Sequence, residues 1–275
     1  MEPFPAYKRR IYFLFFVALF IALLPVVIFY ADGWRFKEGL GLVRTGGIYI
    51  EVPYEDATIS LNDELVGESG FLQRNFYIDD LAPAAYVVRV EGTGYRTWNR
   101  ILVVEPQLVT DARAVLLPED IQLTRLILSG TASSTKTISS TTYNAYRAAF
   151  ATSTVASSTV PVDEESGVAL FIDNGEIIAR WMRDGSPPSA FCGSPSLCDI
   201  ELSIRRIGGE ATDARFFGGG VVYHTKEGGV YFTEIDIRPT AIAAQIYTAS
   251  DADMRIIDDA IIIKSGELFY EVEGL

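Results

Sequence analysis

The longest apolar run of the chain, Ile11 to Ala31, contains no charged residue and directly follows Lys8, Arg9 and Arg10. As a helix with a rise of about 1.5 Å per residue, this run is long enough to cross a hydrocarbon core about 30 Å thick. Basic residues beside a span stay on the cytoplasmic side of the membrane. The pattern therefore predicts a cytoplasmic tail over residues 1–10, a transmembrane helix over 11–31 and an extracytoplasmic location for the rest.

The alternative is a cleaved signal peptide, which has an apolar region of about 7–15 residues followed by a small-residue cleavage site. The run here is longer, and the residues at 30–32, Tyr-Ala-Asp, lack such a site. Tyr30 and Trp34 suit the aromatic belt of a membrane interface. We therefore expect an uncleaved signal anchor in the cell membrane, followed by a juxtamembrane segment over 32–46.

Beyond residue 46, short alternations of apolar and polar residues replace the continuous apolar run, with turn residues between them. Alternation with a period of two is typical of strands that bury one face. The predicted strands lie within 48–52, 57–61, 75–78, 86–90, 101–104 and 112–117. Short strands in this number are enough for a small antiparallel β-sandwich over residues 47–118.

The residues at these positions resemble the PEGA domain. Its pattern is an opening strand, a Pro, a turn, an Ala, a Leu-x-Pro turn, alternating valines, a Gly-Tyr pair and a closing Leu-Pro. The matching residues are Gly47, Pro53, Ala57, Asn62, Gly67, Leu81, Pro83, Val88, Val90, Gly94, Tyr95, Trp98, Val103, Leu117 and Pro118. Asp56 and Ala84 depart from the pattern, because the family has Gly at both places. The resemblance implies an extracytoplasmic envelope module that binds or spaces rather than catalyses.

The segment 119–166 has a different composition, since half of the residues from 129 to 160 are Ser or Thr. Such a tract buries too little apolar surface to offset the entropy of ordering it. We therefore expect a flexible linker here, with O-glycosylation as an open option. The alternation at 121–126 leaves open a strand that belongs to the last domain.

A recurring hairpin marks residues 167–275. The segments 168–182, 221–235 and 260–272 each contain an apolar run, a tight turn and an answering strand. The expected turns, Asn174-Gly175, Gly228-Gly229 and Ser265-Gly266, have the residue types that tight hairpin turns require. Unequally spaced hairpins resemble propeller blades, although a propeller needs about four or more. A shortened propeller-like sheet, a partial array that pairs with another chain and a β-meander all stay open.

The chain carries a formal net charge of −13. This balance opposes binding to nucleic acid or to anionic lipid, and it favours solubility and cations or basic partners. Cys192 and Cys198 are the only cysteines, and a structural disulfide between them is the leading interpretation in an oxidising compartment. Free thiols stay open if that compartment is reducing. A metal pair is disfavoured, because His224 is the only histidine and four ligands cannot be assembled.

The sequence contains no recognisable catalytic motif, and we expect no cofactor. His224 has no nucleophile in a known motif beside it, and we expect it on the polar face of a strand. Adjacent acids such as Asp258 and Asp259 point to opposite faces of a strand, so they cannot act together as a glycosidase pair. Asp251 and Asp253 have a spacing that could hold Ca²⁺, with a solvated turn as the simpler interpretation.

Together these features predict a mainly β protein. It has an N-terminal transmembrane helix, a PEGA-like antiparallel β-sandwich and a second β-domain, either partly propeller-like or a β-meander. Its expected role is non-catalytic: a membrane-anchored binding or scaffold protein that contacts envelope polysaccharide, peptidoglycan or a surface protein. The aromatic residues expected to make this contact are Trp98, Trp181, Tyr223 and Tyr231. The alternatives are a sensor or secretion-accessory subunit acting through a membrane partner, and a glycan-acting enzyme.

Overall fold

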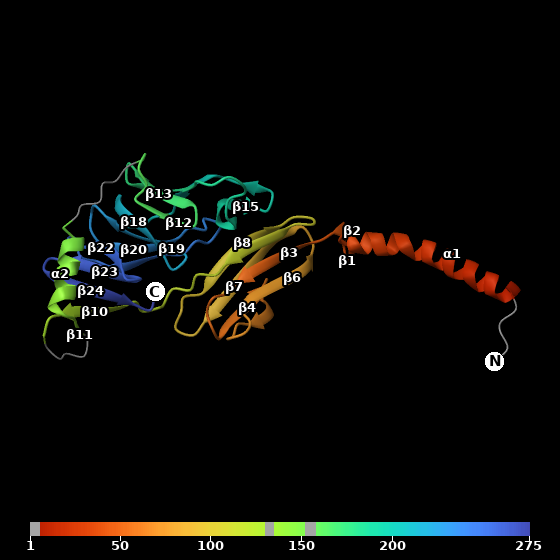
Figure 1. The fold of residues 1–275 in the computed structure, drawn as a ribbon, viewed down its shortest axis with the longest axis horizontal. Coiled ribbons are helices and arrows are strands. Elements are labelled where there is room, and N and C mark those ends of the chain that lie inside the picture. Colours follow the sequence, from red (N-terminus) through yellow and green to blue (C-terminus); the bar gives the residue numbers. More distant parts are fainter. Residues whose placement is uncertain (1–5, 130–134, 152–157) are drawn as a thin grey trace.

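A computed structural model describes residues 6–129, 135–151 and 158–275. Helix α1 (Ala6–Ala31) projects away from a body of β-sheets, in which the sandwich lies between the helix and the C-terminal unit (Figure 1). Among the described residues, α1 is the one helix long and apolar enough to cross a membrane, and none of its apolar window is buried against the protein. Its position and length agree with the predicted span.

A short hairpin joins α1 to the sandwich. It consists of β1 (Trp34–Lys37) and β2 (Gly41–Arg44), which pair antiparallel. The predicted juxtamembrane segment therefore has regular structure.

The predicted sandwich is present as a sheet of order β6-β3-β9 facing a sheet of order β5-β4-β7-β8. The strands are β3 (Gly46–Glu51), β4 (Ala57–Leu61), β5 (Glu64–Glu68), β6 (Asn75–Leu81), β7 (Ala84–Gly92), β8 (Trp98–Val104) and β9 (Val109–Arg113). Each alternating run overlaps one of these strands. The apolar positions of these runs form the core between the two sheets. They include Ile48, Ile50, Ile59, Val88 and Val90. The pair β3–β9 is parallel rather than antiparallel.

The departures from the PEGA pattern have different local outcomes. Asp56 adopts a left-handed φ of +54°, a conformation that Asp tolerates better than most residues. Ala84 begins β7 without a positive φ, and Asp80 ahead of it has the left-handed conformation instead, with φ +55°. The turn before β7 therefore needs no Gly at position 84.

Residues 114–118, here called the strap, connect the sandwich to the C-terminal unit. Ala114 and Leu116 lie in the core of the sandwich, whereas Val115 and Leu117 lie in the core of the C-terminal unit. Because alternate side chains of an extended chain point in opposite directions, one short segment contributes to both cores.

The C-terminal unit contains sheets that we name A (β12-β13-β14-β17), B (β18-β19-β20-β21) and C (β11-β10-β24-β23-β22). The strands of sheet A are β12 (Asp163–Glu165), β13 (Val168–Asp173), β14 (Glu176–Trp181) and β17 (Glu201–Ile204). Those of sheet B are β18 (Ala211–Phe217), β19 (Gly220–Thr225), β20 (Val230–Glu234) and β21 (Ala243–Tyr247). Those of sheet C are β10 (Gln122–Ile127), β11 (Thr135–Thr137), β22 (Asp253–Ile257), β23 (Ala260–Ser265) and β24 (Leu268–Glu273).

The predicted hairpins correspond to β13–β14, β19–β20 and β23–β24. Asn174 and Gly175 form the first turn with φ of +49° and +79°, as a type I′ turn requires. In the last hairpin Ser265 pairs with Leu268, so the predicted turn Ser265-Gly266 is wrong by one residue. Left-handed turns also precede the hairpins, at Ser166-Gly167, Gly218-Gly219 and Asp258-Asp259. The repeat therefore includes one strand more than the hairpin.

Sheet B lies between sheets A and C and is buried on both faces. In β19, Val221 and Tyr223 belong to the core shared with sheet A, whereas Val222 belongs to the core shared with sheet C. Every residue of β20 is buried for the same reason. In the C-terminal unit, sheets A and B are thus β-meanders, whereas sheet C adds β10 and its parallel neighbour β11 to the meander β22–β23–β24. The likeness of the unit to propeller blades stays a prediction.

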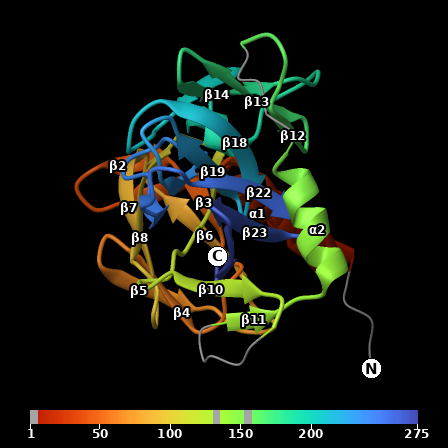
Figure 2. The same ribbon diagram turned by 90° about the vertical axis from the view of Figure 1, so that its left-hand side faces the viewer.

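The prediction of a flexible linker over 119–166 is wrong for much of this segment. Strand β10 pairs with β24 and completes sheet C, and helix α2 (Ser140–Ala149) covers the outer face of that sheet (Figure 2). Ser139 caps α2 through the backbone N–H of Thr142, and aromatic side chains of the segment pack on Phe269. Residues 130–134 and 152–157 of the predicted linker lie outside the described residues.

The aromatic residues explain why a Ser/Thr-rich segment is ordered. Tyr143, Tyr146 and Phe150 are spaced three and four residues apart, so they lie on one face of the helix. Their ring centroids are 5.3, 6.1 and 5.6 Å from that of Phe269. This aromatic cluster supplies the apolar burial that composition alone did not predict.

We expect the substitution Phe269→Ala to lower the free energy of unfolding by about 3–5 kcal/mol, because it removes a buried ring and leaves a cavity. Denaturant unfolding of the full chain measures the loss, and hydrogen exchange should show faster opening of residues 140–149. The matched control is Phe71→Ala, whose ring is 79% exposed, with an expected change within about 0.5 kcal/mol. Equal effects of both substitutions would contradict the packing described.

Candidate binding site at the domain junction

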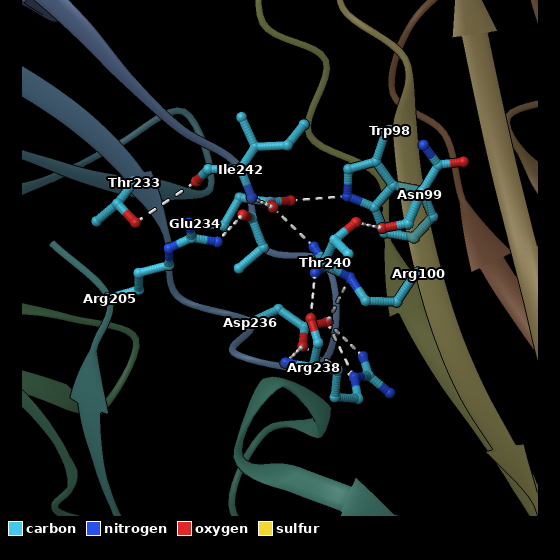
Figure 3. A network of polar contacts seen from close by, with 11 residues as sticks. Trp98, Asn99, Arg100, Arg205, Thr233, Glu234, Asp236, Arg238, Thr240 and Ile242 are labelled. Atoms are coloured by element: carbon cyan, nitrogen blue, oxygen red, sulfur yellow. Dashed lines mark hydrogen bonds and ion pairs between the residues drawn. The ribbon is translucent and has the colours of Figure 1, made fainter. Parts of the chain in front are cut away.

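A buried ion pair joins the sandwich to the C-terminal unit. Arg100 on β8 donates from Nη2 to Oε2 of Glu234 at the end of β20, at 2.7 Å, and both side chains are at most 1% exposed (Figure 3). Trp98 donates from Nε1 to the other oxygen of the same carboxylate at 2.7 Å, and the backbone N–H of Ile242 donates to Oε2 at 2.6 Å. Donors from both units therefore surround the Glu234 carboxylate.

A second charge pair continues the network. Asp236 accepts bonds from the guanidinium of Arg238, with Nε to Oδ1 at 2.9 Å, and it lies 3.8 Å from Nε of Arg100. Arg238 also donates from both terminal nitrogens to the backbone carbonyl of Asp111 in the sandwich, at 3.1 Å each. Through these bonds the side chain of Arg238 holds the backbone of β9.

The loop 235–242, between β20 and β21, lies along β8, which is the edge strand of its sheet. Ile101 donates its backbone N–H to the carbonyl of Pro239 at 2.7 Å, and Thr240 donates to the carbonyl of Asn99 at 3.4 Å. An exposed strand edge is a template for unwanted pairing. The loop therefore satisfies part of this edge while holding the two units together.

A loop closed by the disulfide between Cys192 and Cys198 makes another contact with the sandwich. It follows the 3₁₀ turn η1 (Ser189–Phe191) and forms β15 (Cys192–Ser194) and β16 (Leu197–Cys198). Ser194 and Ser196 donate their hydroxyls to Glu105, just after β8, at 2.5 and 2.8 Å. These hydrogen bonds lower the pKa of the Glu105 carboxyl.

Between these contacts lies a cavity of about 350 Å³, whose walls come from both units. The sandwich contributes Tyr49, Asp111 and Arg113, and the C-terminal unit contributes Glu165, Phe191 and Phe216. The side chains of Asp111 and Glu165 are exposed, whereas Phe191 and Phe216 are buried. A neighbouring hollow of about 340 Å³ extends along the disulfide loop. The junction therefore combines an apolar wall with carboxylates.

The aromatic residues predicted to make contacts do not form a surface. Trp98 and Tyr223 are fully buried and Tyr231 is 7% exposed, while Trp181 is half-buried with its Nε1 donating to the carbonyl of Gly185. The rings of Tyr223 and Tyr231 stack with centroids 5.4 Å apart inside the core between sheets A and B. Burial raises the pKa of Tyr223 to about 12. Trp98, Tyr223 and Tyr231 are therefore core residues, and the structure does not bring the four together.

The acids considered for Ca²⁺ have separate partners. Asp251 accepts from the hydroxyl of Ser265 at 2.7 Å, whereas Asp253 lies 3.1 Å from Nε2 of His224 and 2.7 Å from Arg255. In the described part of the chain, no three His, Cys, Asp or Glu side chains come together to hold a metal ion. His224 on β19 links sheet B to sheet C through Asp253 on β22, and within its own sheet its Nδ1 lies 2.8 Å from the hydroxyl of Thr212.

The sequence contained one signal for the junction that the interpretation missed. The buried face of β8 runs Trp98, Arg100, Leu102, Val104, so alternation places an arginine among core residues. A charged residue at a core position is almost never left unpaired, and it therefore indicates a partner from elsewhere in the chain. Its partner, Glu234, has no comparable local signal.

No protein-family model matches this chain, and no curated protein matches it either. The resemblance of residues 47–118 to the PEGA domain therefore stays an interpretation of the sequence.

We expect Arg100→Met to destabilise the protein by about 3–5 kcal/mol, because it leaves the Glu234 carboxylate buried without its cation. Adding Glu234→Gln should recover part of the loss, because an uncharged amide can still accept a hydrogen bond from Trp98 or Ile242. Denaturant unfolding of the single and double variants measures both effects. If the double variant lost as much free energy of unfolding as the two single variants lose in sum, the two charges would not stabilise each other.

Glu234 should also give the stability of the protein an unusual dependence on pH. Burial raises the pKa of its carboxyl, and the charge of Arg100 offsets only part of that effect. A raised pKa means that the folded state binds the proton more tightly than the unfolded state, so the contribution of Glu234 is present at acidic pH and is lost as pH rises through the folded-state pKa. The stability of the wild type relative to Glu234→Gln should therefore fall as pH rises from 4 upward, a range set by the usual carboxyl pKa near 4.5. Denaturant unfolding of both proteins across this range measures the difference in their free energies of unfolding. A difference that grew in favour of the wild type as pH rises would contradict the prediction.

Proposed function

We propose that this protein is a single-pass, membrane-anchored binding or scaffold protein of the cell envelope, with residues 1–10 in the cytoplasm and both β units outside. The basic residues Lys8, Arg9 and Arg10 before the apolar helix support this orientation. The apolar helix that no other element covers supports the anchor. The PEGA-like pattern at 47–118 supports an envelope role.

The observation that carries the proposal is the cavity at the junction. Its walls belong to two units. The Arg100–Glu234 pair and the hydrogen bonds from Arg238 to the carbonyl of Asp111 hold those units in one arrangement. A cavity between domains is a common location for ligand binding. Walls that are already fixed in place lose less conformational entropy when a ligand binds.

The chemistry of the walls favours a ligand with basic groups. Asp111 and Glu165 have exposed carboxylates. The positive charge of Arg113 is paired with Glu51, with Nε and Oε1 3.9 Å apart. Phe191 and Phe216 give the cavity an apolar wall. An envelope polymer that carries amines, or a basic segment of a surface protein, combines both properties.

The test uses the full-length chain in lipid nanodiscs, incubated with purified envelope polymer and, separately, with envelope protein from the same source. We expect one of the two to bind, and the variant Asp111→Asn with Glu165→Gln to bind roughly tenfold more weakly, because two charge contacts are lost. Sedimentation of the nanodisc complex measures the bound fraction.

The matched control is Glu64→Gln with Glu68→Gln, which removes the same charge from exposed positions of β5. This control should bind as the wild type does. If both variants bound equally well, the cavity would not be the binding site. If neither the polymer nor the protein fraction bound the wild type, the proposed binding role would be wrong.

A further inference from the structure

We propose that the hairpin β1–β2 lies in the interface of the bilayer, with one apolar face against the lipid, and so sets the height and tilt of the β units above the membrane. This inference rests on the membrane anchor of the proposed function.

The hairpin is fixed to the end of the helix rather than tethered loosely. Asp32 donates its backbone N–H to the carbonyl of Ile28 at 2.9 Å, which carries the helical hydrogen bonds into the turn. The ring centroids of Phe29 and Trp34 are 6.1 Å apart. The guanidinium of Arg35 lies 3.8 Å from the ring centroid of Tyr30 and also donates to its carbonyl.

The exposed face of the hairpin is apolar except for Arg44, which lies at the helix end of the hairpin and pairs with Asp32. Phe36 pairs with Leu42 across the strands, so both side chains lie on the same face, and they are 78% and 55% exposed. Leu40 in the connecting turn is 62% exposed. Apolar area in contact with water costs about 25 cal/mol per Å², and the hairpin stands directly beside a helix that spans the bilayer. Lipid is therefore the nearest apolar surface that could cover this face.

The opposite face of the hairpin holds the sandwich. Arg35 forms an ion pair with Asp80 at 2.9 Å, and Val43, its cross-strand partner, is half-buried. At the base of the hairpin, Gln107 donates to the Asp32 carboxylate at 2.9 Å, and Thr45 donates its backbone N–H to the carbonyl of Gly33, also at 2.9 Å. The hairpin thus connects helix and sandwich with one face and leaves the other free for the membrane.

Charge points to the same occupant. Between residues 34 and 44 the chain has three basic residues, Arg35, Lys37 and Arg44, and one acidic residue, Glu38, in a protein whose net charge is −13. Arg35 and Arg44 already form ion pairs with Asp80 and Asp32, so the attraction of basic side chains to lipid phosphates applies mainly to Lys37. Aromatic residues such as Trp34 favour the interface.

The experiment measures depth in the membrane with a single fluorescent label. The two cysteines form a disulfide, so Phe36→Cys or Leu42→Cys gives the full-length chain one reactive thiol in nanodiscs. Lipids with a nitroxide close to the headgroup should quench labels at 36 and 42 several-fold more than a label at Val43→Cys, on the opposite face of the same hairpin. They should leave Leu72→Cys, a 93% exposed residue of the sandwich, unquenched.

A label at Leu19→Cys, within the apolar helix, separates the two proposals by its response to a nitroxide deep in the acyl chains. Quenching at 19 together with weak quenching at both 36 and 42 would overturn the interfacial hairpin and leave the anchor intact. Absence of quenching at 19 would overturn the anchor, and the hairpin inference with it. Equal quenching at 36, 42 and 43 would also contradict the inference, because a hairpin lying on one face must show two depths.

Discussion

The ion pair between Arg100 and Glu234 joins the two β units at a place that solvent does not reach. Removing these charges from water costs several kcal/mol per ion, and their attraction offsets that cost only when the geometry is good and the remaining groups are satisfied. Trp98 and the backbone of Ile242 supply the additional donors to Glu234. Separating the units, or shifting one along the other, would leave a buried charge without its partner. The pair therefore specifies one arrangement of the units more sharply than apolar contact alone could.

The remaining joints of the protein follow from that arrangement. The strap can place Val115 and Leu117 in one core and Ala114 and Leu116 in the other only while the two cores stay side by side. The disulfide loop contacts Glu105, which directly follows β8, and β8 is the strand that carries Arg100. From the apolar helix to sheet C, each element is thus held to the next by specific polar contacts or shared packing, and the cavity keeps its shape between them.

Local patterns predicted the elements whose burial is local. The apolar helix and the alternating strands of the sandwich, such as Ile48 and Ile50 in β3, follow from runs that can be recognised without knowledge of their neighbours. Strand β5 was missed because its residues are largely exposed and have no alternation. The order in 140–149 was missed because composition outweighed the spacing of Tyr143, Tyr146 and Phe150. The core position of Arg100 and the alternation at 121–126 indicate that each has a partner elsewhere in the chain. The identity of these partners was beyond prediction, because nothing near Arg100 indicates Glu234 and nothing near Gln122 indicates Glu273.

The pairing of β10 with β24 also bears on how the chain reaches its final form during synthesis. Residues 122–127 leave the ribosome long before residues 268–273, so the strand that completes sheet C has to wait for almost the whole C-terminal unit to be made. The sandwich, whose strands all lie between 46 and 113, can close well before that moment. Contacts between such distant segments form slowly because the loop between them must first be closed. Folding is thus ordered from the sandwich to sheet C, and residues 268–273 complete a sheet begun by a strand made far earlier.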